Sequence, residues 1–282
     1  MKSMIYPNKL KDRNFANADG CRFELEKTSP LLDVGAVFSN SKMPPSDKAK
    51  TDSSAYLGIE VVHDTTGSAS HHMEVDRALI MTGNSCPRLR IYRWAGFSIT
   101  AGLFVDPAQL LDLDQCRRMN VEIAKRPTGG GVLFHGSDLA VSFFVPGQRL
   151  QGSVEEWCHQ INERLIQAVC LFFPKQQMDE VVRSKERCRF CMSQVTGFDL
   201  LWGGKKIGGC AMRKTRAGIL HQTSLFLTAP DWKRIAMCVT DAEDVGRMQQ
   251  MSTSFDRLTV RKVPLDEVQE AIVNNFLQWN SI

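Results

Sequence analysis

Apolar residues in this chain recur with a helical period in a few stretches and gather into short runs between them. The clearest helix begins at Ser153, which forms a capping-box pattern with Glu156 three residues later. One face of this helix carries an apolar residue at every fourth position, namely Trp157, Ile161, Leu165 and Val169. We expect the helix to end before Pro174, because proline cannot continue a helix. Weaker helical patterns cover residues 71–81, 112–119, 231–239 and 265–279.

Short apolar and β-branched runs between these helices predict strands. The runs are residues 58–62, 89–94, 97–102, 121–125, 139–145, 198–202, 205–213 and 218–227. Gly203 and Gly204 separate two of the runs and predict a tight hairpin, because both central residues of the favoured turn have positive φ. Strand pairs with interspersed helices predict an α+β fold with mixed or antiparallel sheets and flanking helices.

The first part of the chain differs from the rest. Residues 1–57 mix Asn, Asp, Lys and Ser with Pro44 and Pro45, and they show no sustained period. Such a composition cannot fill a core, so we expect an N-terminal extension that is loosely attached or partly disordered. The remaining residues, 58–282, are expected to form one domain.

Composition narrows the class of protein. With 282 residues, of which 43% are hydrophobic, the chain can bury a sizeable core. The net charge of +4 is too small to predict nucleic-acid binding, and no apolar run approaches the roughly 20 residues of a membrane-spanning helix. Nine cysteines without the spacing of a disulfide framework, and no apolar signal segment, predict a cytoplasmic protein. Neither a nucleic acid nor a membrane is expected as a partner.

Candidate chemistry centres on residues 126–144, RPTGGGVLFHGSDLAVSFF. Glycines near a strand cost conformational entropy, but they let a ligand lie against exposed backbone amides. The cations Lys125 and Arg126 precede Gly129, Gly130 and Gly131, so an acyl or phosphoryl group is a candidate ligand of this stretch. A glycine bulge in a sheet accounts for the same residues about equally well.

Lys206 follows the predicted hairpin turn, where it can hold a carboxylate, a phosphate or a developing oxyanion. A solvated hairpin lysine is the commoner outcome and is favoured from the sequence alone. The basic turn of Arg213, Lys214 and Arg216 is either a solvated loop or a patch that steers an acidic protein partner.

Cys191 lies in a basic loop, and nearby cations lower the pKa of a thiol and favour its nucleophilic thiolate. These cations are Lys185, Arg187, Arg189, Lys205 and Lys206. Among nine cysteines, however, any single one is a weak candidate. Cys188 and Cys191 form one CxxC pair, but a pair without further ligands is weak support for zinc, so no metal site is predicted. His135 and His221 are interpreted as structural histidines, since neither has a neighbouring Asp or Ser that compels a catalytic triad.

Two segments together resemble the lipoate-protein ligase and octanoyltransferase family, whose fold is shared with biotin-protein ligases. The first has a basic pair, three glycines and a histidine: Lys125, Arg126, Pro127, Thr128, Gly129, Gly130, Gly131 and His135. The second consists of Gly204, Lys205, Lys206, Ile207, Gly208, Gly209, Cys210 and Ala211, followed by His221. The resemblance covers about residues 58–277 and implies a biotin/lipoate-protein ligase-like catalytic domain over 58–282. The GRGRxG signature of biotin enzymes is absent.

The resemblance also implies roles for individual residues. Lys206 is the lysine that contacts the acyl carbonyl and, in ligases, the phosphate, and Cys191 is the candidate nucleophile. The implied acyl- or adenylate-binding set is Arg126, Thr128, Gly129, Gly130, Gly131, His135, Gly208, Gly209, Ala211 and His221. We expect an apolar tunnel between the sheet and the loop to accept the chain of an octanoyl or lipoyl group.

The family contains two chemistries. In one, the acyl group moves from acyl carrier protein to a cysteine thioester and then to a lysine of a lipoyl domain, without a cofactor. In the other, ATP and Mg²⁺ activate free lipoate as an adenylate. Cys191 lies fifteen positions before Lys206, which is the spacing of the thioester branch, and this route is favoured. The expected targets are the lipoyl domain of a 2-oxoacid dehydrogenase E2 or a glycine cleavage H protein.

Two departures from the transferase pattern leave other possibilities open. Gly131 stands where cysteine-dependent transferases usually have Arg, and Cys210 replaces the usual Ser or Asn. The alternatives are an ATP-dependent lipoate-protein ligase and a catalytically silent protein that binds lipoyl domains or a fatty acid.

Overall fold

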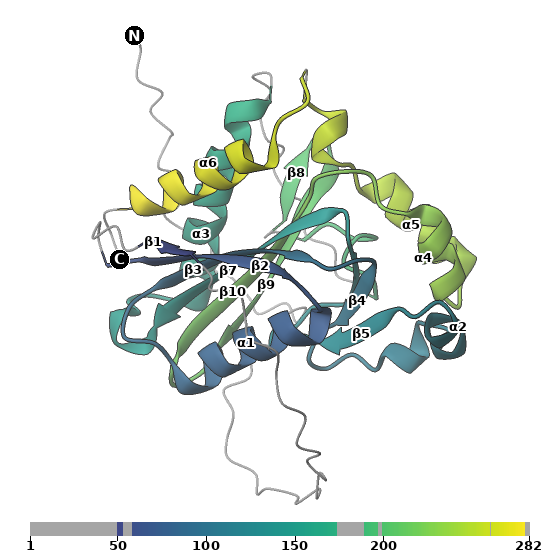
Figure 1. Ribbon diagram of the computed structural model, residues 1–282, viewed down its shortest axis with the longest axis horizontal. Coiled ribbons are helices and arrows are strands. Elements are labelled where there is room, and N and C mark those ends of the chain that lie inside the picture. Colours follow the sequence, from purple (N-terminus) through teal and green to yellow (C-terminus); the bar gives the residue numbers. More distant parts are fainter. Residues whose placement is uncertain (1–49, 53–57, 174–188, 197–198, 260, 280–282) are drawn as a thin grey trace, which may run out of the picture.

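The computed structural model describes residues 50–52, 58–173, 189–196, 199–259 and 261–279. Within them the chain forms two β-sheets, and helices pack on both faces of the larger sheet (Figure 1). This arrangement confirms the predicted α+β class with mixed sheets and flanking helices.

The larger sheet contains seven strands in the described residues, in the order β1-β2-β3-β7-β10-β9-β8. Their bounds are Lys50–Asp52 for β1, Glu60–Gly67 for β2, Arg88–Trp94 for β3, Asp138–Pro146 for β7, Gly218–Phe226 for β10, Lys205–Lys214 for β9 and Leu200–Trp202 for β8. Neighbouring strands are antiparallel except β2 and β3, which are parallel. Strand β1 belongs to the stretch that the sequence sets apart as an extension, and it pairs with β2.

The smaller sheet has the order β5-β4-β6, with β5 at Glu122–Lys125, β4 at Ser98–Ala101 and β6 at Val132–His135. Residues 189–191 continue this sheet beside β6. The amide of Val132 donates to the carbonyl of Arg189, and the amide of Cys191 donates to the carbonyl of Val132, both at 2.8 Å. Cys191 is therefore fixed by backbone pairing next to the first residue of β6.

The two faces of the larger sheet carry different elements. Helices α3 (Val154–Val169) and α6 (Leu265–Leu277) cover one face, and α1 (Ala69–Thr82) and the smaller sheet lie on the other (Figure 1). Alternation along β10 separates the side chains, since a strand points successive residues to opposite faces. Ile219 and Leu225 join the apolar core under α3 and α6, whereas Gln222 contacts α1.

Three further helices surround the smaller sheet and form a second apolar cluster with it. They are α2 (Leu113–Arg118), α4 (Trp232–Cys238) and α5 (Ala242–Met251). Short 3₁₀ turns occupy Pro107–Gln109, Gly147–Arg149, Cys170–Phe172 and Phe255–Arg257.

Strand β5 also fixes the start of α1. The carboxylate of Glu122 accepts hydrogen bonds from the amides of Ala69 at 2.7 Å and Ser70 at 2.9 Å, and the Ser68 side chain accepts from the amide of His71. Burial raises the pKa of Glu122, but these hydrogen bonds outweigh burial and lower it. An ionised Glu122 thus satisfies the free amides at the start of the helix and ties the smaller sheet to α1.

Most local predictions are confirmed. Ser153 and Glu156 form the predicted capping box at the start of α3, and Gly203 and Gly204 form the hairpin turn with φ of 57° and 70°. The sequence analysis missed β6 and α5. Strand β6 follows the glycines directly and has only four residues, while only Asp244, Val245 and Met248 of α5 are buried, so its apolar period is short.

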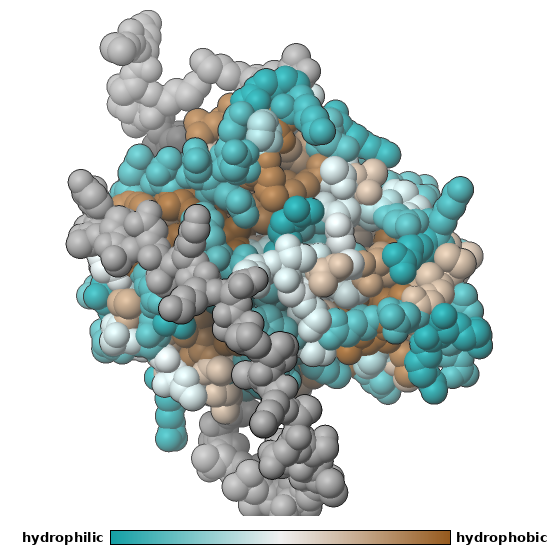
Figure 2. All heavy atoms as spheres, viewed as in Figure 1, coloured by the Kyte–Doolittle hydropathy of each residue, from teal (hydrophilic) through white to brown (hydrophobic). Residues whose placement is uncertain are grey.

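The surface is mainly polar in the view of Figure 2, where apolar side chains are visible beside α6 as it packs on the larger sheet. Among the described helices, none combines the length and apolar composition that crossing a membrane requires.

Candidate active site

The glycine stretch forms a loop between β5 and β6 that lies directly on the end of β4. The amide of Gly102 donates to the carbonyl of Gly131 at 3.1 Å, and the amide of Leu103 donates to the carbonyl of Thr128 at 2.8 Å. A side chain at Gly102 would place Cβ 2.0 Å from the carbonyl oxygen of Gly130. Gly130 itself has φ of 91°. The loop thus requires glycine both for its own backbone and where it meets β4.

Arg126 holds the carbonyl groups of the glycine loop in place. Its side chain is buried, and its Nη2 donates to the carbonyls of Gly131 at 2.6 Å and Gly129 at 3.2 Å. Its Nη1 donates to the carbonyl of Thr100 at 3.1 Å and to the hydroxyl of the same residue at 2.7 Å. Nη2 also lies 3.7 Å from the Sγ atom of Cys191. One buried cation therefore holds the loop carbonyls and faces a half-buried thiol.

Lys206 is buried, with 2% of its surface exposed. Its Nζ forms an ion pair with Asp199 at 2.8 Å and donates to the carbonyls of Cys191 at 2.7 Å and Gln194 at 3.3 Å. The interpretation of a solvated hairpin lysine is therefore wrong. A lysine ammonium has three N–H donors, and these contacts employ them to tie the hairpin to the segment that carries Cys191.

A chain of hydrogen bonds leads from Arg126 to a buried carboxylate. Thr100 Oγ1 lies 2.7 Å from His135 Nε2, and His135 Nδ1 lies 2.8 Å from Asp138 Oδ2. Arginine only donates, so the Thr100 hydroxyl accepts from Arg126. An ionised carboxylate only accepts, so Nδ1 of His135 carries a proton and donates it to Asp138. His135 therefore does have a neighbouring Asp, contrary to the sequence interpretation, but it reaches the thiol only through Thr100 and Arg126.

Asp138 anchors the far end of this chain. Trp94 Nε1 and Ser224 Oγ donate to its Oδ2 at 3.1 and 2.7 Å, and the amide of Gly136 donates to Oδ1 at 3.1 Å. Burial raises the pKa of Asp138, but the contact with His135 and these hydrogen bonds outweigh burial and lower the pKa. Asp138 is ionised at neutral pH, and Trp94 stacks on the His135 ring with centroids 3.8 Å apart.

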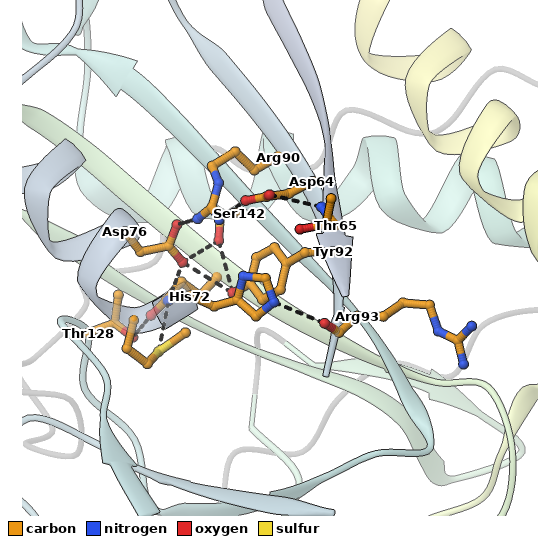
Figure 3. A network of polar contacts seen from close by, with 11 residues as sticks. Asp64, Thr65, His72, Asp76, Arg90, Tyr92, Arg93, Thr128 and Ser142 are labelled. Atoms are coloured by element: carbon orange, nitrogen blue, oxygen red, sulfur yellow. Dashed lines mark hydrogen bonds and ion pairs between the residues drawn. The ribbon is translucent and has the colours of Figure 1, made fainter. Parts of the chain in front are cut away.

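A second polar network lies behind the loop, against α1 (Figure 3). The carboxylate of Asp76 accepts from Arg90, Tyr92, Ser142 and Gln222. The hydroxyl of Thr128 donates to Gln222 Oε1 at 2.6 Å. Burial and the nearby Asp76 raise the pKa of Tyr92 well above its usual value, so its hydroxyl remains a donor. Thr128 is thus held by a network of hydrogen-bonded side chains, and the predicted apolar tunnel stays a prediction.

The remaining residues of the predicted acyl-binding set lie on opposite faces of the larger sheet. A side chain on Gly130 would meet Cys191 Sγ at 3.4 Å and Ala211 Cβ at 3.9 Å, and one on Gly209 would meet Lys206 Cε at 2.6 Å. Ala211 and Gly209 therefore belong to the site. Gly208 instead faces Leu200 and the carbonyl of Ser224.

His221 lies on the face of α3, where its Nε2 is 2.9 Å from Asn162 Oδ1. The structure does not bring His221 to the glycine loop. Cys210 shares this face, 4.0 Å from the Sγ atom of Cys158. The contact with Cys158 and burial raise the pKa of the Cys210 thiol well above its usual value, so this thiol is protonated at neutral pH and is a poor nucleophile.

Of the cations predicted around Cys191, Lys205 is exposed and Arg189 pairs with Asp244, with Nη1 and Oδ2 3.4 Å apart. Lys185, Arg187 and Cys188 lie outside the described residues. Within the part of the chain that the structure describes, the cation beside the thiol is Arg126.

Two surface hollows are found among the described residues. One, of about 240 Å³, is lined in part by Phe97, Phe134 and Arg234, and the other, of about 200 Å³, by residues 229–257. Neither of these two hollows is lined by Cys191 or Lys206.

Sequence reasoning missed Thr100, Asp138 and Asp199. Asp138 follows His135 by three residues, a spacing that points to a local hydrogen bond. Thr100 and Asp199 reach the site only through strand pairing and the hairpin, which no short spacing reveals.

Comparison with known proteins agrees with this arrangement. Residues 68–277 match the family described as lipoyl protein ligase A/B catalytic domain. The chain is 23% identical over 221 residues to the octanoyltransferase LipM of Carboxydothermus hydrogenoformans, covering 74% of this chain and 81% of that protein. It is 27% identical over 219 residues to LipM of Symbiobacterium thermophilum, covering 73% and 80%.

Among solved structures, the chain resembles lipoate-protein ligase A bound with ATP. The TM-score is 0.59 at 20% identity, covering 77% of this chain and 83% of the other. This likeness shows that the chain has the fold of that ligase.

Proposed function

The chain belongs to the lipoyl protein ligase A/B catalytic domain family, and we propose that it transfers an octanoyl group to a lysine of a lipoyl domain through a thioester on Cys191. The observation that carries the proposal is the position of this thiol. The Cys191 thiol lies against the glycine loop, 3.7 Å from the Arg126 guanidinium. The backbone carbonyl of Cys191 accepts a hydrogen bond from Lys206 at 2.7 Å. A buried cation beside a thiol stabilises the thiolate, which is the nucleophilic form.

The reaction proceeds in two acyl transfers. The Cys191 thiolate attacks the carbonyl carbon of octanoyl-carrier protein, a carbon–sulfur bond forms to Cys191, and the carrier thiolate leaves and takes up a proton. The neutral amine of the target lysine then attacks the enzyme thioester. The Cys191 thiolate leaves, and the amine proton passes to solvent, so the products are an octanoyl amide and the free carrier thiol.

Lys206 is proposed to stabilise the negative charge on the acyl oxygen. In the structure its Nζ is occupied by Asp199 and by two carbonyls. The acyl oxygen therefore replaces one of these carbonyls when the substrate binds. Asp199 stays paired with Lys206 throughout, and the exchange also frees the segment at Cys191 to open the acyl site.

A lipoate-protein ligase is the second candidate. It is favoured by Gly131, which gives the loop the three-glycine form of ligases. In that mechanism Lys206 holds the adenylate phosphate, ATP and Mg²⁺ are required, and Cys191 is dispensable. The octanoyltransferase route requires neither cofactor.

The lipoyl domain is proposed to dock at the β9–β10 turn. Arg213, close to the end of β9, reaches the glycine loop, since its Nη1 donates to the carbonyl of Pro127 at 3.2 Å. Lys214 and Arg216 are exposed on the turn, and such charges favour an acidic partner through long-range attraction.

Intact-mass spectrometry tests the proposal directly. An apo lipoyl domain is incubated with the protein and either octanoyl-carrier protein or octanoate with ATP and Mg²⁺. We expect octanoyl addition only with the carrier-protein donor, accompanied by an octanoylated enzyme. Addition only with ATP would establish the ligase, and no addition in either reaction would favour the binding-only alternative.

The loop geometry gives a matched pair of variants. Gly130→Ala forces an unfavourable positive φ and places Cβ 3.1 Å from Arg126 Nη2 and 3.4 Å from Cys191 Sγ. We expect octanoyl transfer to fall by about 100-fold, since small displacements of reacting groups have effects of this size. Gly129→Ala is the control, because a Cβ there has no atom within 4 Å. Equal loss in both variants, measured by initial rates, would contradict the proposed role of Gly130.

A further inference from the structure

A sulfur-rich cluster lies on the face of the larger sheet opposite to Cys191. It consists of Cys158 on α3, Cys210 on β9 and His221 on β10, whose donor atoms all lie within 4.8 Å of one another. Cys158 and His221 are buried and Cys210 is half-buried. These residues come from three elements that are distant in sequence, and the proposed acyl transfer employs none of them.

The distance between the two sulfurs is close to that in a tetrahedral metal centre. The two Sγ atoms are 4.0 Å apart. With zinc–sulfur bonds of about 2.3 Å and zinc–nitrogen bonds of about 2.0 Å, the edges between ligand atoms in a tetrahedron are roughly 3.3–3.8 Å. The two sulfurs therefore need to approach each other by only a few tenths of an ångström, and the sulfur–nitrogen distances, which are within 4.8 Å, need to shorten by at most about an ångström.

Asn162 lies at the centre of the cluster. Its Nδ2 is 3.4 Å from Cys210 Sγ and 3.8 Å from Cys158 Sγ, and its Oδ1 is 2.9 Å from His221 Nε2. The amide thus occupies the space between the three side chains, and it has to swing aside when a metal ion binds there. The displaced Asn162 Oδ1 or a water molecule then supplies the fourth donor atom.

The surroundings of His221 favour ligation through Nε2. Its Nδ1 lies 3.2 Å from the hydroxyl of Thr223, which can accept a proton from Nδ1 when Nε2 binds a metal. A hydrogen bond of this kind fixes the tautomer and the ring orientation of metal-binding histidines.

We propose that Cys158, Cys210 and His221 bind one zinc ion, with a water molecule or Asn162 Oδ1 in the fourth position. Two thiolates and an imidazole form a donor set that suits zinc, whereas magnesium and calcium prefer oxygen. On binding, the two thiols release two protons to solvent and the ion gains two zinc–sulfur bonds. The ion joins α3 to β9 and β10, and it thereby braces the strand whose other face carries Gly209 and Ala211.

Cobalt(II) is a suitable probe, because tetrahedral cobalt thiolates show intense visible bands and sulfur-to-cobalt charge-transfer bands. The reduced, metal-free full chain is titrated with cobalt(II) and then with zinc. We expect one equivalent of cobalt to produce both sets of bands and one equivalent of zinc to abolish them. Zinc should also raise the unfolding temperature of the wild type.

Variants locate the site. Cys210→Ser and His221→Gln should lose the tetrahedral bands, whereas Cys191→Ser should retain them, which separates this proposal from the proposed acyl transfer. Cys116→Ser is the matched control. Cys116 contacts Cys238 as a second cysteine pair, but within the described residues this pair is not part of a three-donor cluster.

The proposal is overturned if folded wild type gives no thiolate bands, or if the bands persist in a Cys158→Ser, Cys210→Ser double variant. Circular dichroism verifies that each variant is folded. If the serine variants unfold, protection of Cys158 and Cys210 from alkylation by zinc in the wild type, read by peptide mass, decides the question. Equal labelling with and without zinc refutes the site.

Discussion

Cys191→Ser is expected to abolish octanoyl transfer from carrier protein, with a loss of roughly 10⁴-fold or more, the scale seen when an enzyme loses its nucleophile. Arg126 at 3.7 Å from Sγ can stabilise a thiolate, but it cannot remove a proton from a serine hydroxyl, whose pKa is far higher. The octanoylated enzyme should also disappear from the mass spectrum. Initial rates on an apo lipoyl domain, with both donors, measure the effect.

Cys170→Ser is the control for this variant, because Cys170 is also half-buried but lies at the end of α3 in the core under the larger sheet. Its activity should equal that of the wild type. If Cys191→Ser kept its activity with ATP and Mg²⁺ alone, the adenylate route would replace the thioester route, and Cys191 would be a residue that only lines the site.

The sequence predicted the family and the α+β fold well because both depend on local patterns. The capping box at Ser153, the Gly203-Gly204 turn and the two glycine-rich motifs each occupy a short stretch. The family and the enzyme class, an acyltransferase or ligase, are confirmed by the family match and by relatives named octanoyltransferase. The acyl donor, the cofactor and the target stay predictions.

The sequence did not reveal which polar side chains are buried. Lys206 follows a tight turn, and such lysines are usually solvated, yet Asp199 and two carbonyls surround it. These partners reach Lys206 because the segment at Cys191 pairs with β6. The two segments are far apart in the sequence, so no rule based on residue spacing predicts the pairing. The same pairing brings Cys191 to Arg126.

The alternation of side chains along a strand explains why His221 lies away from the other predicted site residues. The motif places it in a strand after the hairpin, but its register partner is Met212, whereas that of Gln222 is Ala211. Adjacent positions on a strand point to opposite faces. Gln222 thus contacts Thr128 and the glycine loop, while His221 joins Asn162 and Cys210 beneath α3.

Lys206→Met should lower octanoyl transfer by about 10²- to 10³-fold, because removing one donor to a developing oxyanion has an effect of this size. Methionine fills nearly the same volume but carries no charge. It also leaves the buried Asp199 carboxylate without its ion pair, and breaking a buried pair costs about 3–5 kcal/mol of stability. Thermal unfolding is therefore measured together with initial rates, so that a loss of stability can be distinguished from a loss of catalysis.

The double variant Lys206→Met, Asp199→Asn achieves this separation. Replacing the carboxylate with an amide removes the uncompensated charge, so stability should recover while activity stays low. Lys205→Met, at the exposed neighbouring position, should have no effect on either property. If the double variant regained activity together with stability, Lys206 would be a structural residue that holds the Cys191 segment, and the charge on the acyl oxygen would have to be stabilised by the amides of the glycine loop alone.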